Sequence, residues 1–375
     1  MKPLPDNPFR PGFGRLPPFL AGRDHEKGYL RTLLHCLRVG ERDSEAVLLH
    51  GPRGNGKTAI LRWLQLEASD KFNLRQIKAH FVSNPTVVVE NLLGSHRDES
   101  REETMHGTIG GGVPGVLRSE GTRQLTRRQT VSLSLDSAMK QTARGKPLLM
   151  IMDEAHTADP AGMGVFLNAF QDSAGMAPMR LVLAGTSDVR DVLSAADATF
   201  ADRINQLPIG LLSPAAGRAA ITEPFAGHGI DAAGGVVERL AAWADNYPYF
   251  LQLVGEAAWM ETANFGRLTG EAGEAAIEQA RVPRNRYYST RYEELAASGH
   301  LEFGVAIAAA VGAGGHRIKK VDVEEIARQH CGKGWSAAVD FIVRKGFLWR
   351  PHLEPDFQAG IPSLMDYTVK RHERE

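Results

Sequence analysis

The stretch Gly51 to Thr58, GPRGNGKT, has the residue types and spacing of a loop that binds phosphate groups. It fits the pattern G-x-x-x-x-G-K-[ST] without a mismatch, although an ordinary glycine-rich turn is the alternative. In such a loop, backbone amides face phosphate oxygens, the lysine reaches the β- and γ-phosphates, and the last hydroxyl holds magnesium. The residues expected to contact a nucleotide here are Gly51, Pro52, Arg53, Gly54, Asn55, Gly56, Lys57, Thr58 and Ala59.

Two carboxylates form the second half of the expected site. Asp153 and Glu154 directly follow the apolar run Leu148 to Met152, which predicts a buried strand. The carboxyl ends of parallel strands border the crevice where ligands bind, so both side chains should lie beside the phosphate loop. Asp153, with Thr58, would hold the magnesium ion, and Glu154 would polarise the water that attacks the γ-phosphate. Either carboxylate alone could be a helix cap, but together with the glycine loop they predict a nucleotide site.

Other residues have types that could assist phosphoryl transfer. Thr186 and Ser187 follow the apolar run MRLVLAG, and either hydroxyl could bind the attacking water or the γ-phosphate; turn residues are the alternative. Arg203 could stabilise phosphoryl-transfer charge in a neighbouring subunit, or pair with a surface carboxylate. We expect His156 to position other groups or lie at the surface rather than to act as a base.

The elements that must position these residues alternate between strands and helices. Short apolar runs predict strands at Ala46–His50, near Ile77–Val82, at Leu148–Met152 and within MRLVLAG and RINQLPIG. This alternation predicts an α/β fold with a parallel, doubly wound sheet, the core of a P-loop NTPase. We expect residues 1–212 to contain an extended arm and this core, with a glycine-rich, basic insertion at about 94–128.

Two smaller units are predicted after the core. Residues 213–282 are alanine-rich and helical, and Pro224 and the loop Asn246-Tyr247-Pro248 should divide them into four helices. Residues 283–375 contain helical patterns, a GAGGHRIKK loop and a final apolar-polar strand, a combination typical of a winged helix-turn-helix. Its recognition helix would be Ser336 to Lys345.

Composition limits the partners and the compartment. The chain of 375 residues has Lys plus Arg 44 and Asp plus Glu 44, so any nucleic-acid surface must be local. The longest nearly unbroken apolar stretch, Phe303 to Gly314, is too short to cross a bilayer, and the first residues lack an apolar signal core. The cysteines, Cys36 and Cys331, form no metal or redox motif. We therefore expect a cytoplasmic protein without a membrane partner.

Six stretches carry a family resemblance: NPFRPGFGRLPPFLAGRDHE, GPRGNGKT, LLMIMDEAH, LVLAGTSD, ADRINQLPIGLLSP and DNYPYFLQLVGEAAW. With them the chain resembles AAA+ ATPases of the branch shared by origin-recognition initiators and STAND nucleotide switches, particularly bacterial ATPases with a C-terminal winged helix. The resemblance implies ATP with Mg²⁺, and residues 213–282 as a helical lid. It also places Gly22 and Arg23 beside the adenine, and Asn246 and Pro248 at the nucleotide. The lid stretch lacks the sensor arginine of many such lids, which favours slow, switch-like hydrolysis.

Three functions fit these patterns. The first is a Mg²⁺-dependent ATPase whose nucleotide state reorients the lid and a winged-helix-like domain. The second is an ATP-licensed DNA-binding regulator or loader, and the third is a switch that docks a partner effector protein. A homo-oligomer is a further alternative, because Arg203 would act only where subunits meet. The residues expected to contact DNA are Arg317, Lys319, Lys320, Arg344 and Lys345.

Overall fold

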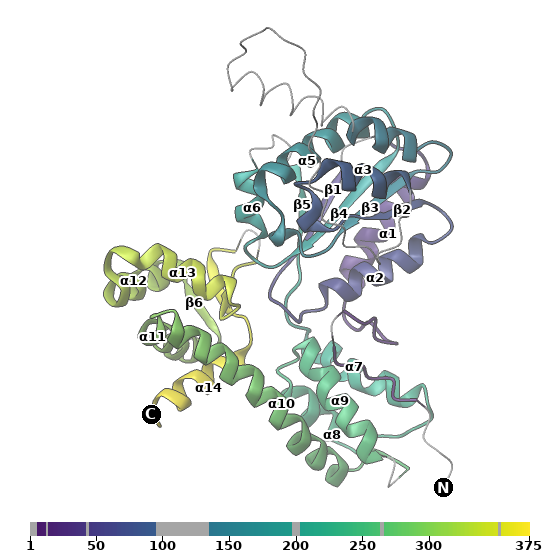
Figure 1. The fold of residues 1–375 in the computed structure, drawn as a ribbon. Helices are drawn as coiled ribbons and strands as arrows, with labels where there is room; N and C mark the ends of the chain where they lie inside the picture. Colours follow the sequence, from purple (N-terminus) through teal and green to yellow (C-terminus); the bar gives the residue numbers. More distant parts are fainter. Residues whose placement is uncertain are drawn as a thin grey trace, which may run out of the picture.

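A computed structural model describes residues 6–12, 14–42, 45–94, 135–196, 203–262, 266–351 and 354–375. Its N-terminal half is built on a five-stranded sheet with the order β2-β3-β4-β1-β5 (Figure 1). The strands are β1 (Ala46–His50), β2 (Asn73–Gln76), β3 (Leu148–Met152), β4 (Met179–Gly185) and β5 (Asn205–Pro208). All their pairings are parallel, which confirms the expected P-loop NTPase sheet.

Helices cover both faces of this sheet, and β1 shows how the sequence achieves it. Val47 and Leu49 pack with α1 (Asp24–Arg38) and α2 (Lys57–Ala68) on one face. Ala46 and Leu48 pack on the other face, because successive strand residues point to opposite sides. This second face is covered by α3 (Pro85–Leu93), the helical residues 135–142, α5 (Pro160–Ala174) and α6 (Val189–Ala195). The central strands are therefore mostly apolar, as the sequence suggested, with Arg180 of β4 and His50 of β1 as buried polar exceptions.

The second expected strand was placed wrongly. It lies at β2 rather than near 77–82, where residues 79–81 form a 3₁₀ turn. β2 is an edge strand whose residues, NLRQ, are half-buried or exposed, so its sequence has no apolar run. Ile77 and Val82 are buried apolar residues outside the strand. The expected insertion falls, from residue 95 on, outside the described residues.

The helical stretch that follows contains α7 (Pro214–Ala226), α8 (Val236–Trp243), α9 (Pro248–Thr262) and α10 (Gly270–Ala297). The Ser213 hydroxyl accepts a hydrogen bond from the Ala216 amide and caps α7. Pro224 does not separate two helices as expected: it lies inside α7, near its end, where it removes a single backbone donor. α10 continues through Pro283, so the expected boundary between residues 282 and 283 falls within one helix, which leads into the last unit (Figure 1).

The C-terminal unit, residues 301–375, consists of α11 (Leu301–Ala313), β6 (Arg317–Lys319), α12 (Lys320–Cys331), α13 (Trp335–Arg344), β7 (Leu348–Trp349), β8 (Asp356–Ala359) and α14 (Pro362–His372). Its three strands form an antiparallel sheet with the order β6-β8-β7. The expected GAGGHRIKK loop therefore includes a strand, in which Ile318 is buried opposite Phe357. Among the described helices, none is long and apolar enough to span a membrane.

Candidate nucleotide site

The phosphate loop runs from the end of β1 to the start of α2, as the sequence predicted. Gly51 has φ 153° and passes so close to the neighbouring chain that a Cβ would lie 2.2 Å from the Ile209 carbonyl oxygen. At Gly54, where φ is +78°, a Cβ would lie 1.8 Å from the Tyr247 hydroxyl. Larger residues would clash at both positions, so these glycines shape the loop. The Asn55 side chain donates to the Ile209 carbonyl at 3.1 Å and fixes the loop to the chain after β5.

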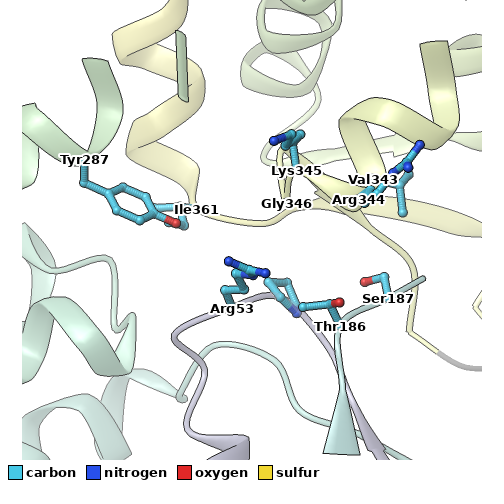
Figure 2. Close-up of a pocket in the computed structure, with 10 residues that line it drawn as sticks. Arg53, Thr186, Ser187, Tyr287, Val343, Arg344, Lys345, Gly346 and Ile361 are labelled. Atoms are coloured by element: carbon cyan, nitrogen blue, oxygen red, sulfur yellow. The ribbon is translucent and has the colours of Figure 1, made fainter. Parts of the chain in front are cut away.

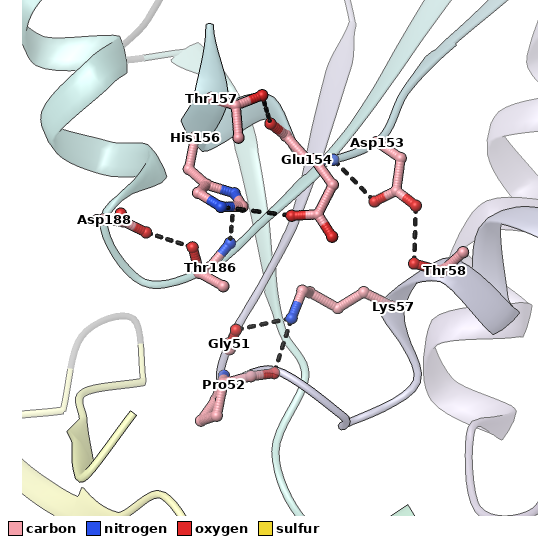
Figure 3. A network of polar contacts seen from close by, with 10 residues as sticks. All are labelled: Gly51, Pro52, Lys57, Thr58, Asp153, Glu154, His156, Thr157, Thr186 and Asp188. Atoms are coloured by element: carbon pink, nitrogen blue, oxygen red, sulfur yellow. Dashed lines mark hydrogen bonds and ion pairs between the residues drawn. The ribbon is translucent and has the colours of Figure 1, made fainter. Parts of the chain in front are cut away.

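Lys57 is folded back onto its own loop. Its Nζ donates to the carbonyl oxygens of Gly51 at 2.8 Å and Pro52 at 2.7 Å (Figure 3). Burial lowers the pKa of Lys57 from 10.5 to about 8, and the nearby carboxylates of Glu154 and Asp153 oppose this shift only in part. A buried ammonium held only by carbonyl dipoles is suited to accept an anionic partner.

The two predicted carboxylates lie where β3 ends, facing the phosphate loop. The Thr58 hydroxyl donates to Asp153 Oδ2 at 2.7 Å, and the Glu154 amide donates to Asp153 Oδ1 at 2.9 Å. Glu154 has a left-handed backbone with φ 53°, and its side chain extends toward Lys57 (Figure 3). A hydroxyl and a carboxylate are hard oxygen ligands that suit Mg²⁺, which takes few protein ligands and completes its shell with phosphates and water. The described residues contain no cluster of three His, Cys, Asp or Glu that could hold a metal alone.

Residues of the N-terminal segment contact the phosphate loop and the chain after β5. The buried Arg23 donates to the carbonyl oxygens of Asn55 at 3.0 Å and Gly210 at 2.6 Å. Burial lowers the pKa of its guanidinium, and Glu26, 3.5 Å away, offsets part of that effect. Gly22 lies against Ala216 of α7. The structure therefore places Gly22 and Arg23 at the junction of core and helical lid.

The lid contacts the loop through a residue that the sequence analysis missed. The Tyr247 hydroxyl donates to the Arg53 carbonyl at 2.7 Å, and its ring is buried against Phe250 with centroids 4.8 Å apart. The predicted Asn246 and Pro248 flank it, with Pro248 starting α9. Tyr247 directly precedes the apolar, aromatic start of α9, PYFLQLV, and no local pattern identifies its partner 194 residues away.

At the tip of β4, Thr186 and Ser187 lie beside the loop, as expected. The Thr186 hydroxyl is hydrogen-bonded to Asp188, and the Thr186 amide donates to His156 Nδ1 at 3.4 Å (Figure 3). Arg203 is exposed just before β5. A role for Arg203 in a neighbouring subunit stays a prediction, since the structure contains a single chain.

The five residues expected to contact DNA lie in two places. Arg317, Lys319 and Lys320 are on or beside β6, where Arg317 pairs with Glu354 at 3.6 Å. Arg344 and Lys345 end α13 and line a pocket whose opposite wall is Arg53, Thr186 and Ser187 (Figure 2). These two cations thus border the phosphate site. This placement does not favour DNA contact through them in the present arrangement.

Trp349 of β7 attaches the C-terminal unit to the domain that contains the parallel sheet. Its ring meets His50 edge-on with centroids 6.5 Å apart, and a Cβ on Gly210 would lie 3.0 Å from it. Trp349 is only 4 % exposed, yet it is absent from the apolar core shared by its neighbours Phe347 and Leu348. Its burial therefore comes from the core domain. A second attachment joins Ser363 of α14 to Asp245 of the lid and to Tyr288 in the second half of α10.

Comparisons with known proteins agree with this geometry. Residues 20–183 match the family model described as AAA ATPase domain. A Walker-type ATPase of Pyrococcus abyssi has a similar structure, with TM-score 0.60 and 14 % identity over 94 % of this chain and 96 % of that one. The ORC2 protein of Aeropyrum pernix gives 0.56 and 13 % over 97 % and 98 %. CDC6P of Pyrobaculum aerophilum gives 0.51 and 16 % over 99 % of both chains. No curated protein sequence matches the chain.

These structural similarities, at low identity, establish the fold. The family match begins just before Gly22 and ends within β4, so it includes the phosphate loop and both carboxylates. The match to an AAA ATPase domain therefore covers the residues of the candidate nucleotide site that lie on or next to β1, α2 and β3.

Proposed function

We propose that the protein binds ATP with Mg²⁺, hydrolyses it slowly, and uses the bound nucleotide to set the position of the lid and the C-terminal unit. The observation that carries this proposal is the Thr58–Asp153 hydrogen bond beside the buried Lys57, at the carboxyl edge of the parallel sheet. Lys57 would bind phosphate here and Thr58 with Asp153 would hold magnesium, next to the carboxylate of Glu154. The ORC2 protein of Aeropyrum pernix, which has a similar fold, was solved in complexes with ADPNP and ADP.

In the proposed reaction, Lys57 leaves the carbonyls of Gly51 and Pro52 and donates to the β- and γ-phosphates. Thr58 and Asp153 would hold Mg²⁺, which when bound supplies positive charge to the phosphate oxygens. Glu154 orients the attacking water and accepts its proton. Gly22 and Arg23 would border the adenine, and Asn246 and Pro248 would face the nucleotide from the lid.

Three contacts support a link between nucleotide state and domain position. Tyr247 joins the lid to the phosphate loop, Trp349 joins the C-terminal unit to the end of β1, and Ser363 joins that unit to the lid. A phosphate that reshapes the loop must change at least the first of these contacts. A ligand shifts a conformational equilibrium only through such differential contacts.

The C-terminal unit has the element order of a winged helix: helix, strand, two helices, then two strands. DNA binding licensed by ATP is a second candidate function, and Arg317 with Lys319, both exposed on β6, favours it. Docking of an effector protein is the third. If subunits meet, Arg203 would reach a neighbour's phosphates.

The proposal is tested by measuring nucleotide binding and phosphate release together. Lys57→Ala should abolish binding of a fluorescent ATP analogue, whereas Glu154→Gln should leave binding intact and stop turnover. Unaltered affinity of Lys57→Ala would show that the nucleotide does not bind at this loop. Continued phosphate release by Glu154→Gln would show that Glu154 is not the general base. Tight binding without any turnover in the unmodified protein would leave a nucleotide-binding switch that is not an enzyme.

A further inference from the structure

A histidine connects the ends of two neighbouring strands at the phosphate site. His156 lies in the 3₁₀ turn Ala155–Thr157 that follows β3, and its side chain is 8 % exposed. Its Nε2 lies 3.3 Å from Glu154 Oε2. Its Nδ1 lies 3.4 Å from the backbone nitrogen of Thr186, the first residue after β4 (Figure 3).

These two partners determine which ring nitrogen carries the proton. A backbone N–H can only donate, so Nδ1 of His156 accepts from Thr186 and the proton of the neutral ring is on Nε2. Nε2–H is then directed at a carboxylate oxygen of Glu154, which accepts it. One neutral imidazole therefore satisfies both neighbours without a charge of its own.

Glu154 needs such a partner. Its side chain is 59 % exposed, so on its own it would sample several rotamers. A general base must stay within hydrogen-bond reach of the water that it activates. In the structure one carboxylate oxygen is held by His156, and the side chain extends toward Lys57, where the phosphates would lie (Figure 3). The other oxygen remains available to a water.

We propose that His156 is the positioning residue for Glu154 in ATP hydrolysis, an inference that rests on the proposed function. Thr186 fixes the imidazole from β4, and the imidazole fixes the carboxylate at the end of β3. The His156 ring contacts Glu154 and the Thr186 amide, and it is the Glu154 side chain that extends toward Lys57 (Figure 3). The contribution of His156 is therefore to turnover and not to nucleotide affinity.

Three substitutions separate the two hydrogen bonds. His156→Ala removes both. His156→Asn keeps an acceptor near the position of Nδ1 for Thr186 but offers no donor to Glu154. His156→Gln places an amide donor near the position of Nε2 and can keep the bond to Glu154. His35→Ala is the matched control, because His35 is exposed on α1, where its ring contacts Arg38.

The experiment measures steady-state phosphate release from Mg²⁺-ATP and, separately, the dissociation constant of a fluorescent ATP analogue. We expect kcat to fall about tenfold or more in the Ala and Asn variants, as a fraction of what a general base contributes. His156→Gln should recover a large part of that loss. Nucleotide affinity should stay within about twofold of the unmodified protein in every variant, because His156 contacts Glu154 and Thr186 and is not expected to contact the nucleotide. His35→Ala should match the unmodified protein in both measurements.

Three results would overturn the inference. An unchanged kcat in His156→Ala, while Glu154→Gln abolishes turnover, would reject it and leave the proposed function intact. Loss of nucleotide affinity in all three variants would show a structural role instead. An equal loss of kcat in the Gln and Asn variants would show that the hydrogen bond from His156 to Glu154 does not cause the effect. Absence of turnover in the unmodified protein would instead reject hydrolysis itself, and this inference with it.

Discussion

The depressed pKa of Lys57 predicts that nucleotide affinity falls as the pH rises above about 8. Without nucleotide, burial keeps the pKa of Lys57 near 8, while the same group in the unfolded chain titrates at 10.5. The unfolded chain thus binds more protons between these values. The free energy of unfolding of the nucleotide-free protein should therefore rise as the pH increases from about 8 to 10.5. Below pH 8 the buried Lys57 is charged, and the full cost of burying that charge destabilises the folded protein.

Phosphate binding reverses this shift, because the anionic β-phosphate favours the charged ammonium. Binding above pH 8 must then take up a proton on Lys57. Each pH unit above the free pKa leaves about a tenth of the previous protonated fraction, so affinity should drop about tenfold between pH 7 and pH 9. The same argument predicts a slope of log Kd against pH that approaches about one above pH 8.

ADP without magnesium is the ligand for this test, since it isolates Lys57 from the Thr58 and Asp153 site. Calorimetric titrations at pH 7, 8 and 9, each in two buffers with different ionisation enthalpies, give both the affinity and the number of protons taken up. Lys57→Arg is the control, because a guanidinium stays charged throughout this range. Its affinity should be weaker but constant with pH. Equal affinity of the unmodified protein at pH 7 and 9, or a parallel fall in the Arg variant, would refute the reasoning.

Three further predictions concern the contacts around the site. Tyr247→Phe removes one buried hydrogen bond to the Arg53 carbonyl and should lower the free energy of unfolding by about 1–2 kcal/mol in urea denaturation; no change would show that the bond is not formed in solution. Trp349→Ala should release the C-terminal unit from the core at a cost of about 3 kcal/mol, seen as faster proteolytic cleavage in α10 with ATP affinity retained. Equal cleavage rates would mean that Trp349 does not attach the unit. Joint replacement of Arg317, Lys319 and Lys320 by Ala should abolish salt-sensitive DNA binding; binding that is absent before the replacement, or that survives it, rejects β6 as the DNA surface.

The sequence predicted where the residues of the candidate nucleotide site lie in the fold, because its signals are local. A glycine loop between a strand and a helix, and two carboxylates after an apolar run, fix the positions of Lys57, Thr58, Asp153 and Glu154 by the geometry of a parallel sheet alone. Tyr247 could not be found in this way. It is a buried aromatic residue in an aromatic segment, and its functional contact joins positions far apart in the chain.

The direction in which a charged side chain points also could not be predicted from the sequence. Arg344 and Lys345 were assigned to DNA because basic residues are in excess between Arg317 and Arg350. The structure turns the end of α13 toward the phosphate loop, and Lys345 pairs there with Glu294 at 3.2 Å. Such an orientation depends on how α10 and Trp349 dock the whole unit. No periodicity within α13 contains that information.

Under the proposed function, the same docking would make ATP hydrolysis and DNA binding steps of one mechanism. While the Trp349 ring contacts His50, the end of α13 faces the phosphate loop, so Arg344 and Lys345 would not be accessible to a DNA duplex. DNA contact through Arg344 and Lys345 would then require that the unit detach, which breaks the Trp349 contact. That contact is worth about 3 kcal/mol. Reversing a conformational equilibrium from 1:99 to 99:1 requires about 5.5 kcal/mol of differential binding. If the γ-phosphate interacts with Lys57 only in the docked or only in the detached state, a binding-energy difference of this size would decide whether α13 faces the nucleotide or a partner.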